Sequence, residues 1–482
     1  MMFREKIDAF IDSKTEEMIK DLETLVRIDS KRGTPEEGKP FGEGPAQALA
    51  AAQEMMERYG LITKNYDNYV VTGDLADKEK GLDILAHLDV VPVTEDWKVT
   101  KPFEPKIVDG RIYGRGTADD KGPAIAALYA IRAIRELGIP MKRNVRLILG
   151  GDEECGSSDL RHYYSIEEEA PYSFTPDADF PVINIEKGRL EGTLQADFED
   201  GLQLPGIISL QSGDKVNVVP QKARFVVAGL EKNVIAEAAE QLEKEIGVTF
   251  SIRPADGGEQ GEGLADVKQF LVEVKGQAAH ASTPQEGKNA LTAALRLISQ
   301  LPLAATDGQK ALDALDALLP YEDTCGKTLG IYRKEEQSGA LTLCFSILNY
   351  TPEKLTGMFD ARLPIGCNAE NTKLPVAEKL KEYGITLADT PVVEPHCVPG
   401  DSDFVRTLLS SYERYTGIKG EPLSTGGGTY VHNLKRGVAF GCVTPDVDNH
   451  MHGDDEFMVI ERLVTSAKIF ADAIIRVCNE LD

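Results

Sequence analysis

Residues 82–91 read LDILAHLDVV, a short apolar run that carries an imidazole and a carboxylate near its end. A run of this length and composition predicts a buried strand. Residues 120–138, DKGPAIAALYAIRAIRELG, place apolar side chains at helical spacing and predict a helix. The runs NVRLILGG at 144–151 and FPVINIE at 180–186 predict two further buried strands. This alternation predicts an α/β domain whose mixed, largely parallel sheet is flanked by helices.

The chain is too long for a single hydrophobic core. Its 482 residues exceed the roughly 250 to 300 at which single cores stop growing. Residues 4–28 predict an amphipathic helix, and β-rich segments such as ARFVVAGL and TGMFDARLP dominate residues 188–394. We therefore expect residues 1–187 and 395–482 to form one α/β domain, with 188–394 inserted into it as an α+β domain.

Charge and cysteine usage narrow the class of protein. The formal net charge of -26 gives an acidic surface that repels phosphate backbones, so nucleic acid is not an expected partner. Seven cysteines without a CxxC pair are typical of reduced thiols. The N-terminus does not resemble a signal peptide, and no stretch is apolar enough to span a bilayer, so we expect a soluble, cytoplasmic protein. The glycine-rich stretch 257–263 predicts a loop.

Polar residues follow the predicted strands at the end where α/β sheets bind ligands. His87 and Asp89 lie two residues apart at the end of the first strand, so both side chains should point to one face. Asp89 could then orient His87 as a metal ligand. An HxD pair alone is weak evidence for a metal site.

Two carboxylate pairs occur in glycine-containing turns. In GGDEECGS, Glu153 and Glu154 are neighbours, so one carboxylate could bind a metal while the other handles a proton. An isolated pair of this kind is more often a solvated loop. In GRGTADDKGP, Asp119 and Asp120 precede the predicted helix, where capping of the helix is the simpler interpretation.

Two further candidates are ambiguous when each is considered alone. Asp177 lies beside Pro176 and could serve only the turn, and His452 could be a surface imidazole. Together, however, two imidazoles and several carboxylates in loops predicted at one sheet edge form the ligand mix that suits zinc, manganese or cobalt. The set therefore favours a metal site.

The motifs LAHLDVVP, GRGTADDKGP, GGDEECGS, TPDADFP and MHGDDE, in this order, resemble those of the aminoacylase and glutamate-carboxypeptidase family of di-metal hydrolases. The resemblance covers nearly the whole chain. The closest similarity is to the dipeptidase V branch, whose members act as monomers on unblocked dipeptides, including those with N-terminal β-alanine. It implies a catalytic domain that binds two divalent ions, most readily Zn2+, with Mn2+ or Co2+ as alternatives, and an inserted lid domain of two related halves.

The resemblance also implies a role for each candidate residue. His87 and Asp177 become ligands of one metal, Glu154 and His452 ligands of the other, and Asp119 the bridge between them. Asp89 becomes the residue that orients the ligands, and Glu153 becomes the general base.

Three neighbours are alternatives in register: Asp120, Asp152 and His450. His452 is preferred to His450 because the family pattern has an acidic residue four positions after the ligand, where this chain has Glu456.

The inserted segment contains GQAAHASTPQEGKNA, which resembles the lid motif of the family and offers His280 to the substrate carbonyl. By the same resemblance, the substrate carboxylate and the developing oxyanion would be held by Asn217, Arg362 and the glycines Gly426, Gly427 and Gly428. A lone histidine is more often structural, and an arginine or a glycine loop can equally be a surface ion pair or an ordinary turn.

The resemblance predicts hydrolysis of a dipeptide bond by a metal-activated water, with hinges near residues 187 and 395 that close the lid. An N-acyl or N-succinyl amino acid amidohydrolase or a carboxypeptidase would use the same constellation with a different pocket. A silent binding protein with this fold is the alternative outside the enzyme class.

Overall fold

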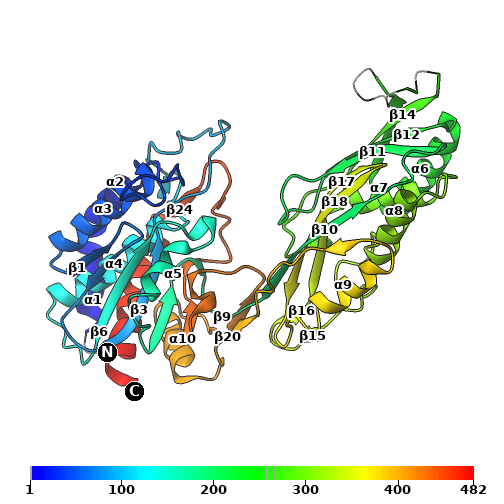
Figure 1. Cartoon of the computed structure of the whole chain (residues 1–482). Coiled ribbons are helices and arrows are strands. Elements are labelled where there is room, and N and C mark those ends of the chain that lie inside the picture. Colours follow the sequence, from blue (N-terminus) through cyan, green and yellow to red (C-terminus); the bar gives the residue numbers. More distant parts are fainter. Residues whose placement is uncertain (1–2, 257–258, 260, 262, 265, 482) are drawn as a thin grey trace. The chain divides into compact units, whose positions relative to one another are not determined.

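The computed structural model describes residues 3–256, 259, 261, 263–264 and 266–481 (Figure 1). The glycine-rich loop predicted at 257–263 lies largely outside the described residues. The chain divides into two compact units. Unit 1 comprises Met1–Ile185 and His396–Asp482, and unit 2 comprises Glu186–Pro395.

Unit 1 is built on a nine-stranded sheet in the order β1-β2-β6-β3-β7-β22-β9-β20, with β21 paired to β9. Its strands are β1 (Ile62–Tyr66), β2 (Val70–Asp74), β3 (Lys80–His87), β6 (Asn144–Gly150), β7 (Tyr172–Thr175), β9 (Val182–Glu186), β20 (His396–Cys397), β21 (Pro422–Thr425) and β22 (Gly437–Ala439). The central strands β6, β3, β7 and β22 run parallel, and antiparallel pairs flank them. The predicted mixed α/β sheet is confirmed.

Helices cover both faces of this sheet. They are α1 (Arg4–Ser13), α2 (Thr15–Val26), α3 (Glu43–Arg58), α4 (Lys121–Glu136), α5 (Ser158–Tyr164), α10 (Asp403–Thr416) and α11 (Ile460–Glu480). Alternate residues of β3 point to opposite faces, as a pleated strand requires. Ile84 joins the large core that contains α4 and α11, whereas Leu85 packs with Leu160 of α5 and Tyr430. Both faces are therefore apolar, which explains the nearly continuous apolar run at residues 82–91.

Short elements complete unit 1. They are β4 (Lys106–Val108), β5 (Arg111–Tyr113) and β24 (Phe457–Val459) in one sheet, β8 (Ala178–Asp179) paired with β23 (Cys442–Val443), and the 3-10 turns η1 (Glu153–Cys155) and η4 (Tyr430–Asn433).

Several elements of unit 1 differ from the sequence prediction. The single helix predicted over residues 4–28 is wrong, because the chain breaks at Lys14 into α1 and α2. The hydroxyls of Ser13 and Thr15 bond to the carbonyls of Phe10 and Ile11, and such bonds compete with regular helix geometry. Strand β7 was not predicted, because it is only four residues long and half of them are polar.

Unit 2 is an eight-stranded antiparallel sheet in the order β13-β14-β12-β11-β17-β18-β10-β19. These strands are β10 (Gly188–Asp197), β11 (Gly206–Ser212), β12 (Lys222–Ala228), β13 (Thr249–Pro254), β14 (Gln269–Lys275), β17 (Thr342–Thr351), β18 (Lys354–Leu363) and β19 (Thr386–Leu387), and β15 (Lys334–Glu335) pairs with β16 (Gly339–Ala340). The helical elements are α6 (Lys232–Ile246), η3 (Pro284–Glu286), α7 (Ala290–Ser299), α8 (Asp307–Leu318) and α9 (Lys373–Lys381). One core joins this sheet to its helices.

Candidate metal centre and active site

The carboxyl ends of three parallel strands meet at one edge of the unit 1 sheet. His87 is the last residue of β3, Glu153 and Glu154 follow β6, and Asp177 follows β7. Asp119 comes from the turn before α4. Because parallel strands end at the same edge, residues far apart in the sequence lie together here.

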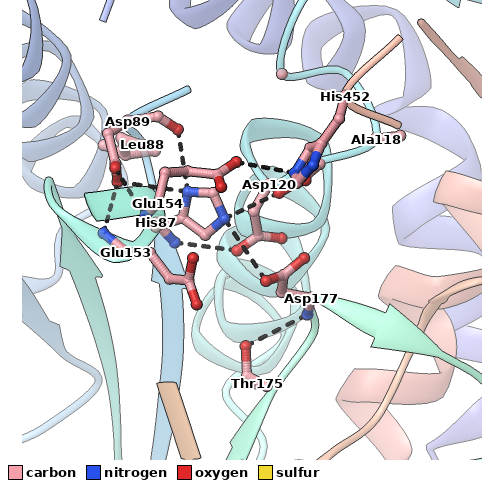
Figure 2. Close-up of polar contacts among 12 residues, drawn as sticks. His87, Leu88, Asp89, Ala118, Asp120, Glu153, Glu154, Thr175, Asp177 and His452 are labelled. Carbon is pink, nitrogen blue, oxygen red and sulfur yellow. Dashed lines mark hydrogen bonds and ion pairs between the residues drawn. The ribbon is translucent and has the colours of Figure 1, made fainter. Parts of the chain in front are cut away.

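A first group of side chains consists of His87, Asp119 and Asp177, whose ligand atoms lie within 4.8 Å of one another. His87 Nε2 lies 2.9 Å from Asp119 Oδ1 and 3.6 Å from Asp177 Oδ2. All three side chains are largely shielded from solvent, and Figure 2 shows His87 and Asp177 turned toward each other. This group can converge on a single cation.

A second group shares Asp119 and adds Glu154 and His452, again within 4.8 Å. His452 Nε2 lies 2.8 Å from Asp119 Oδ2 and 3.2 Å from Glu154 Oε1. Asp119 therefore offers one oxygen to each group. The geometry is that of two adjacent sites with one shared carboxylate.

Asp89 lies behind both groups and is fully buried. Its two carboxylate oxygens accept hydrogen bonds from the backbone N–H groups of Glu153 and Glu154, each at 3.1 Å. His87 Nδ1 lies 3.0 Å from the Asp89 carbonyl oxygen and 3.5 Å from its carboxylate. Asp89 thus contacts the imidazole as predicted and, in addition, fixes the turn that carries both glutamates.

The electrostatics of the two groups favour a bound cation. Hydrogen bonds to Asp119 and Glu154 raise the pKa of His452 to about 11. Burial would lower the pKa of His87, but hydrogen bonds to Asp119, Asp177 and Asp89 outweigh it and raise that pKa well above its usual value. So strong a demand for positive charge among buried carboxylates suits a divalent ion, and imidazole with carboxylate is a donor set that zinc, manganese and cobalt accept. The residues present fit the metal.

Glu153 combines burial with neighbouring negative charge. Burial raises its pKa well above the usual value, and the charges of Asp177 and Glu154 raise it further, while His87 opposes the shift. A carboxylate whose pKa is shifted toward neutrality can accept and return a proton near physiological pH. Burial and the neighbouring carboxylates therefore favour the protonated form of Glu153.

The residues considered as alternatives in register have other partners. The ring of His450 lies against Phe457, with centroids 5.8 Å apart, and is outside both groups. Asp120 accepts a hydrogen bond from the backbone N–H of His87 at 3.0 Å, and Asp152 forms an ion pair with Arg32. The structure thus brings His452, rather than His450, to the shared carboxylate.

Two buried contacts behind the site were not predicted from the sequence. Arg115 forms an ion pair with Glu456, 2.6 Å apart, across the loops that carry Asp119 and His452. The hydroxyl of Tyr430 donates to Asp159, which also accepts the backbone N–H of Asp152 at 2.8 Å. Glu456, four positions after His452, is the one residue of these contacts that the sequence pattern indicated. The contacts themselves could not be predicted, because the partners lie hundreds of residues apart in the sequence.

The other candidates are distributed over both units. The loop of Gly426, Gly427 and Gly428 lies in unit 1, between β21 and η4, and Gly427 N–H donates to Thr425 Oγ1 at 3.2 Å. His280, Asn217 and Arg362 belong to unit 2.

Within unit 2, His280 and Asn217 lie on adjoining segments. The backbone N–H of Ala281 donates to the Asn217 carbonyl at 2.9 Å, and Val218 bridges to His280. His280 Nδ1 accepts the backbone N–H of Ser282 at 3.1 Å. The same nitrogen lies 2.6 Å from the Ser282 hydroxyl oxygen, so Ser282 orients the His280 ring through Nδ1.

Arg362 is held by a neighbour on its own strand, β18. Its Nε and Nη2 donate to the two oxygens of Asp360, both at 2.7 Å, and both residues are buried. This two-point contact fixes the plane of the guanidinium group.

Comparison with known proteins adds independent information. The model of Peptidase family M20/M25/M40 matches residues 84–476. The Beta-Ala-Xaa dipeptidase of Lactobacillus delbrueckii subsp. lactis is 34% identical over 471 residues, covering 96% of each chain. Among solved structures, human carnosine dipeptidase 1 aligns over 99% of both chains with a TM-score of 0.61 and 18% identity. The aminoacylhistidine dipeptidase of Vibrio alginolyticus aligns over 94% of this chain and 96% of that one, with a TM-score of 0.54 and 16% identity.

Proposed function

Because this chain belongs to Peptidase family M20/M25/M40, we propose that it is a metal-dependent dipeptidase that hydrolyses unblocked dipeptides, including those with N-terminal β-alanine. The predicted membership in a family of peptidases is confirmed by the family match. The observation that carries the substrate class is 34% identity to a Beta-Ala-Xaa dipeptidase over nearly the full length of both chains. The pair of ligand groups that share Asp119 supports the metal dependence.

In this proposal five side chains hold two divalent ions. His87 and Asp177 would hold one ion, Glu154 and His452 would hold the other, and Asp119 would be shared between them. Zinc suits this donor set best, and manganese or cobalt are alternatives. When bound, such ions polarise a carbonyl oxygen and lower the pKa of water toward neutrality.

Glu153 is the proposed general base. Its carboxylate accepts the proton of the attacking water and then delivers that proton to the leaving nitrogen of the peptide bond. Asp89 supports this role by holding the backbone of Glu153 and Glu154 through both of its oxygens. In this proposal Glu153 transfers the proton, and Asp89 holds Glu153 in position.

His280 is the proposed donor to the oxygen of the scissile carbonyl. Ser282 contacts Nδ1 of the His280 ring, and a ring protonated at Nε2 can donate a hydrogen bond to a developing negative charge. By the family resemblance, closure about the hinges predicted near residues 187 and 395 would complete the site.

Asn217, Arg362 and the glycine loop at 426–428 are proposed to bind the substrate carboxylate and oxyanion. The guanidinium group of Arg362, whose orientation is fixed by Asp360, is suited to paired hydrogen bonds with a carboxylate. Backbone N–H groups of a glycine loop can form an anion-binding nest.

We also propose that the protein acts in the cytoplasm. All seven cysteines lie within the described residues and are free thiols, as a reducing compartment favours. In the part of the chain that the structure describes, no helix has the length and apolar character needed to cross a membrane.

A substrate panel tests the proposal. The enzyme would be stripped with a chelator, reloaded with zinc or manganese, and offered free dipeptides, a tripeptide, and N-acetyl and N-succinyl amino acids. We expect metal-dependent release of amino acids from the free dipeptides, β-alanyl dipeptides included. Cleavage confined to the blocked amino acids would show that the protein is an amidohydrolase that uses the same chemistry. Absence of cleavage with any metal would favour a silent binding protein.

A further inference from the structure

The buried ion pair between Arg115 and Glu456 lies between the two loops that meet at the shared carboxylate. Arg115 Nη1 is 2.6 Å from Glu456 Oε2, and the two residues are 2% and 0% exposed. Arg115 Nη2 also donates to the carbonyl of Gly453 at 2.9 Å. The pair therefore connects the turn before α4 with the loop at residues 450–456.

Glu456 is bonded closely to the backbone that precedes α4. Its carboxylate accepts N–H groups from Gly116 at 3.1 and 3.2 Å, from Ala118 at 2.8 Å and from Asp119 at 3.2 Å. The last of these is the backbone of the residue shared by the two ligand groups. The position of Asp119 is thus set by a side chain that is itself outside both groups.

His452 needs support of a different kind. Its backbone has a φ of 61°, in the left-handed region that costs a non-glycine residue free energy, and His450 and Asp455 in the same loop also have positive φ. Its side chain is 57% exposed, so packing contributes little to holding it. The side chains of Arg115 and Glu456 tie this loop to the Asp119 turn, beside the backbone bond from Gly114 N–H to the Glu456 carbonyl at 3.0 Å.

Stability alone gives little reason for an ion pair at this position. Desolvating two charges costs several kcal/mol, and well-packed apolar residues in such a place are often as stable or more so. A charged pair can do what apolar residues cannot, since it accepts three backbone N–H groups and donates to a carbonyl in one fixed geometry.

We propose that Arg115 and Glu456 are positioning residues for the group of Asp119, Glu154 and His452, and that they hold Asp119 and His452 close enough to bind one cation. The inference rests on the proposed function, because it requires that the two ligand groups bind metal. It deepens that function by naming what assembles the group of Asp119, Glu154 and His452. Neither positioning residue contacts metal or substrate in this role.

The variant Glu456→Gln tests the proposal because it keeps the size of the side chain and removes its charge. The full-length protein would be stripped of metal and titrated with cobalt(II) against a competing chelator, following the visible absorption of the bound ion. His452→Ala would be titrated in parallel to identify the binding step that depends on His452. We expect Glu456→Gln to weaken that same step by about tenfold to a hundredfold and to change the other step less.

Asp74→Asn is the matched control. Asp74 pairs with Arg146 at 2.8 Å, both residues are largely buried in unit 1, and neither belongs to a ligand group. The control should lose thermal stability as Glu456→Gln does, yet retain both metal affinities. If Glu456→Gln fails to fold, Arg115→Lys takes its place, because it keeps the charge but loses the paired contacts with Glu456 and Gly453.

Each outcome bears on the proposal. Selective weakening of the step that depends on His452 supports it. Unchanged affinities in the variant, equal weakening of both steps, or equal weakening in Asp74→Asn would show a merely structural role and overturn it. A wild-type protein that binds fewer than two ions would instead refute the two-metal site of the proposed function, and the inference with it.

Discussion

Asp89 shows how one buried residue organises the proposed chemistry. Its backbone carbonyl lies against the His87 imidazole, and its two carboxylate oxygens hold the N–H groups of Glu153 and Glu154. One candidate ligand from each group and the proposed base therefore depend on a single residue, through its backbone carbonyl and its carboxylate. Contacts of this kind around metal ligands fix ring orientation and ligand basicity.

Replacing the proposed base should separate catalysis from metal binding. Glu153→Gln keeps the shape of the side chain but cannot accept a proton, so we expect kcat to fall by about a hundredfold to ten-thousandfold while cobalt(II) still binds. Steady-state kinetics on a β-alanyl dipeptide and a metal titration measure the two quantities. Glu54→Gln, an exposed carboxylate on α3, is the control and should keep full activity. A kcat within tenfold of wild type in Glu153→Gln would remove this residue from the mechanism.

The role of His280 predicts a different kinetic signature. His280→Ala should reduce kcat by about a hundredfold to a thousandfold, since it removes one donor to the developing oxyanion. Metal content should not change, because His280 belongs to unit 2 and to neither ligand group. The nearby variant Gln277→Ala, in an exposed position of the same segment, should be indistinguishable from wild type. Activity of His280→Ala equal to that of Gln277→Ala would contradict the assignment.

The candidate ligands could be predicted from the sequence because each follows a recognisable strand or turn motif. The structure brings His87, Asp119, Glu154, Asp177 and His452 together, while their roles stay predictions. Arg115 could not be found in this way. Its partner Glu456 is 341 residues away, and no local pattern encodes a contact over that separation.

At the scale of elements, Glu167 joins strands β1 and β3 of the unit 1 sheet. Its carboxylate accepts hydrogen bonds from Tyr66 at 2.7 Å, Lys80 at 3.1 Å and Lys64 at 3.3 Å. Tyr66 and Lys64 belong to β1, and Lys80 begins β3. The bond from Tyr66 and the neighbouring lysines lower the pKa of Glu167 to about 2.

This shift makes the stability of the sheet depend on pH. A depressed folded-state pKa stabilises the fold above the unfolded value of 4.5 and ceases to do so as the pH falls toward about 2. In metal-free protein, Glu167→Gln should therefore have a lower Tm than wild type at neutral pH. The gap should narrow as the pH falls below about 4.5. Thermal unfolding of both proteins across this range measures it, and a gap that stays constant with pH would contradict the assigned linkage.

Helices and strands with a clear pattern of apolar residues could be predicted from the sequence. Short elements, and breaks within a continuous pattern, could not. The predicted helix at 120–138 and the strands at 82–91 and 144–151 correspond to α4, β3 and β6. The break at Lys14 escaped prediction because the apolar spacing continues across it, while the neighbouring hydroxyls bond to backbone carbonyls. Helices α8 and α9 were also missed within the β-rich segment.

At the scale of the whole molecule, unit 2 carries an eight-stranded sheet within one chain. One of its edge strands, β19, is only two residues long, and the other, β13, ends in Arg253 and Pro254. Short edges and proline disfavour pairing with another chain. We therefore propose that the protein is a monomer.

The oligomeric state can be measured directly. Light scattering on the full-length protein should give a mass near 52.6 kDa across the accessible range of concentration. Because the proposed site needs residues of one chain only, specific activity should not change on dilution. A mass near twice this value, or activity lost on dilution, would contradict the monomer.

The most direct test of the central claim is the recovery of activity as zinc is titrated into chelator-stripped enzyme, with release of amino acid from a β-alanyl dipeptide as the readout. Two adjacent ligand groups that share Asp119 predict no activity without metal and full activity at two equivalents of zinc per chain. Hydrolysis that persists in the stripped enzyme, or that never returns at any zinc concentration, would contradict the claim that this chain is a two-metal dipeptidase.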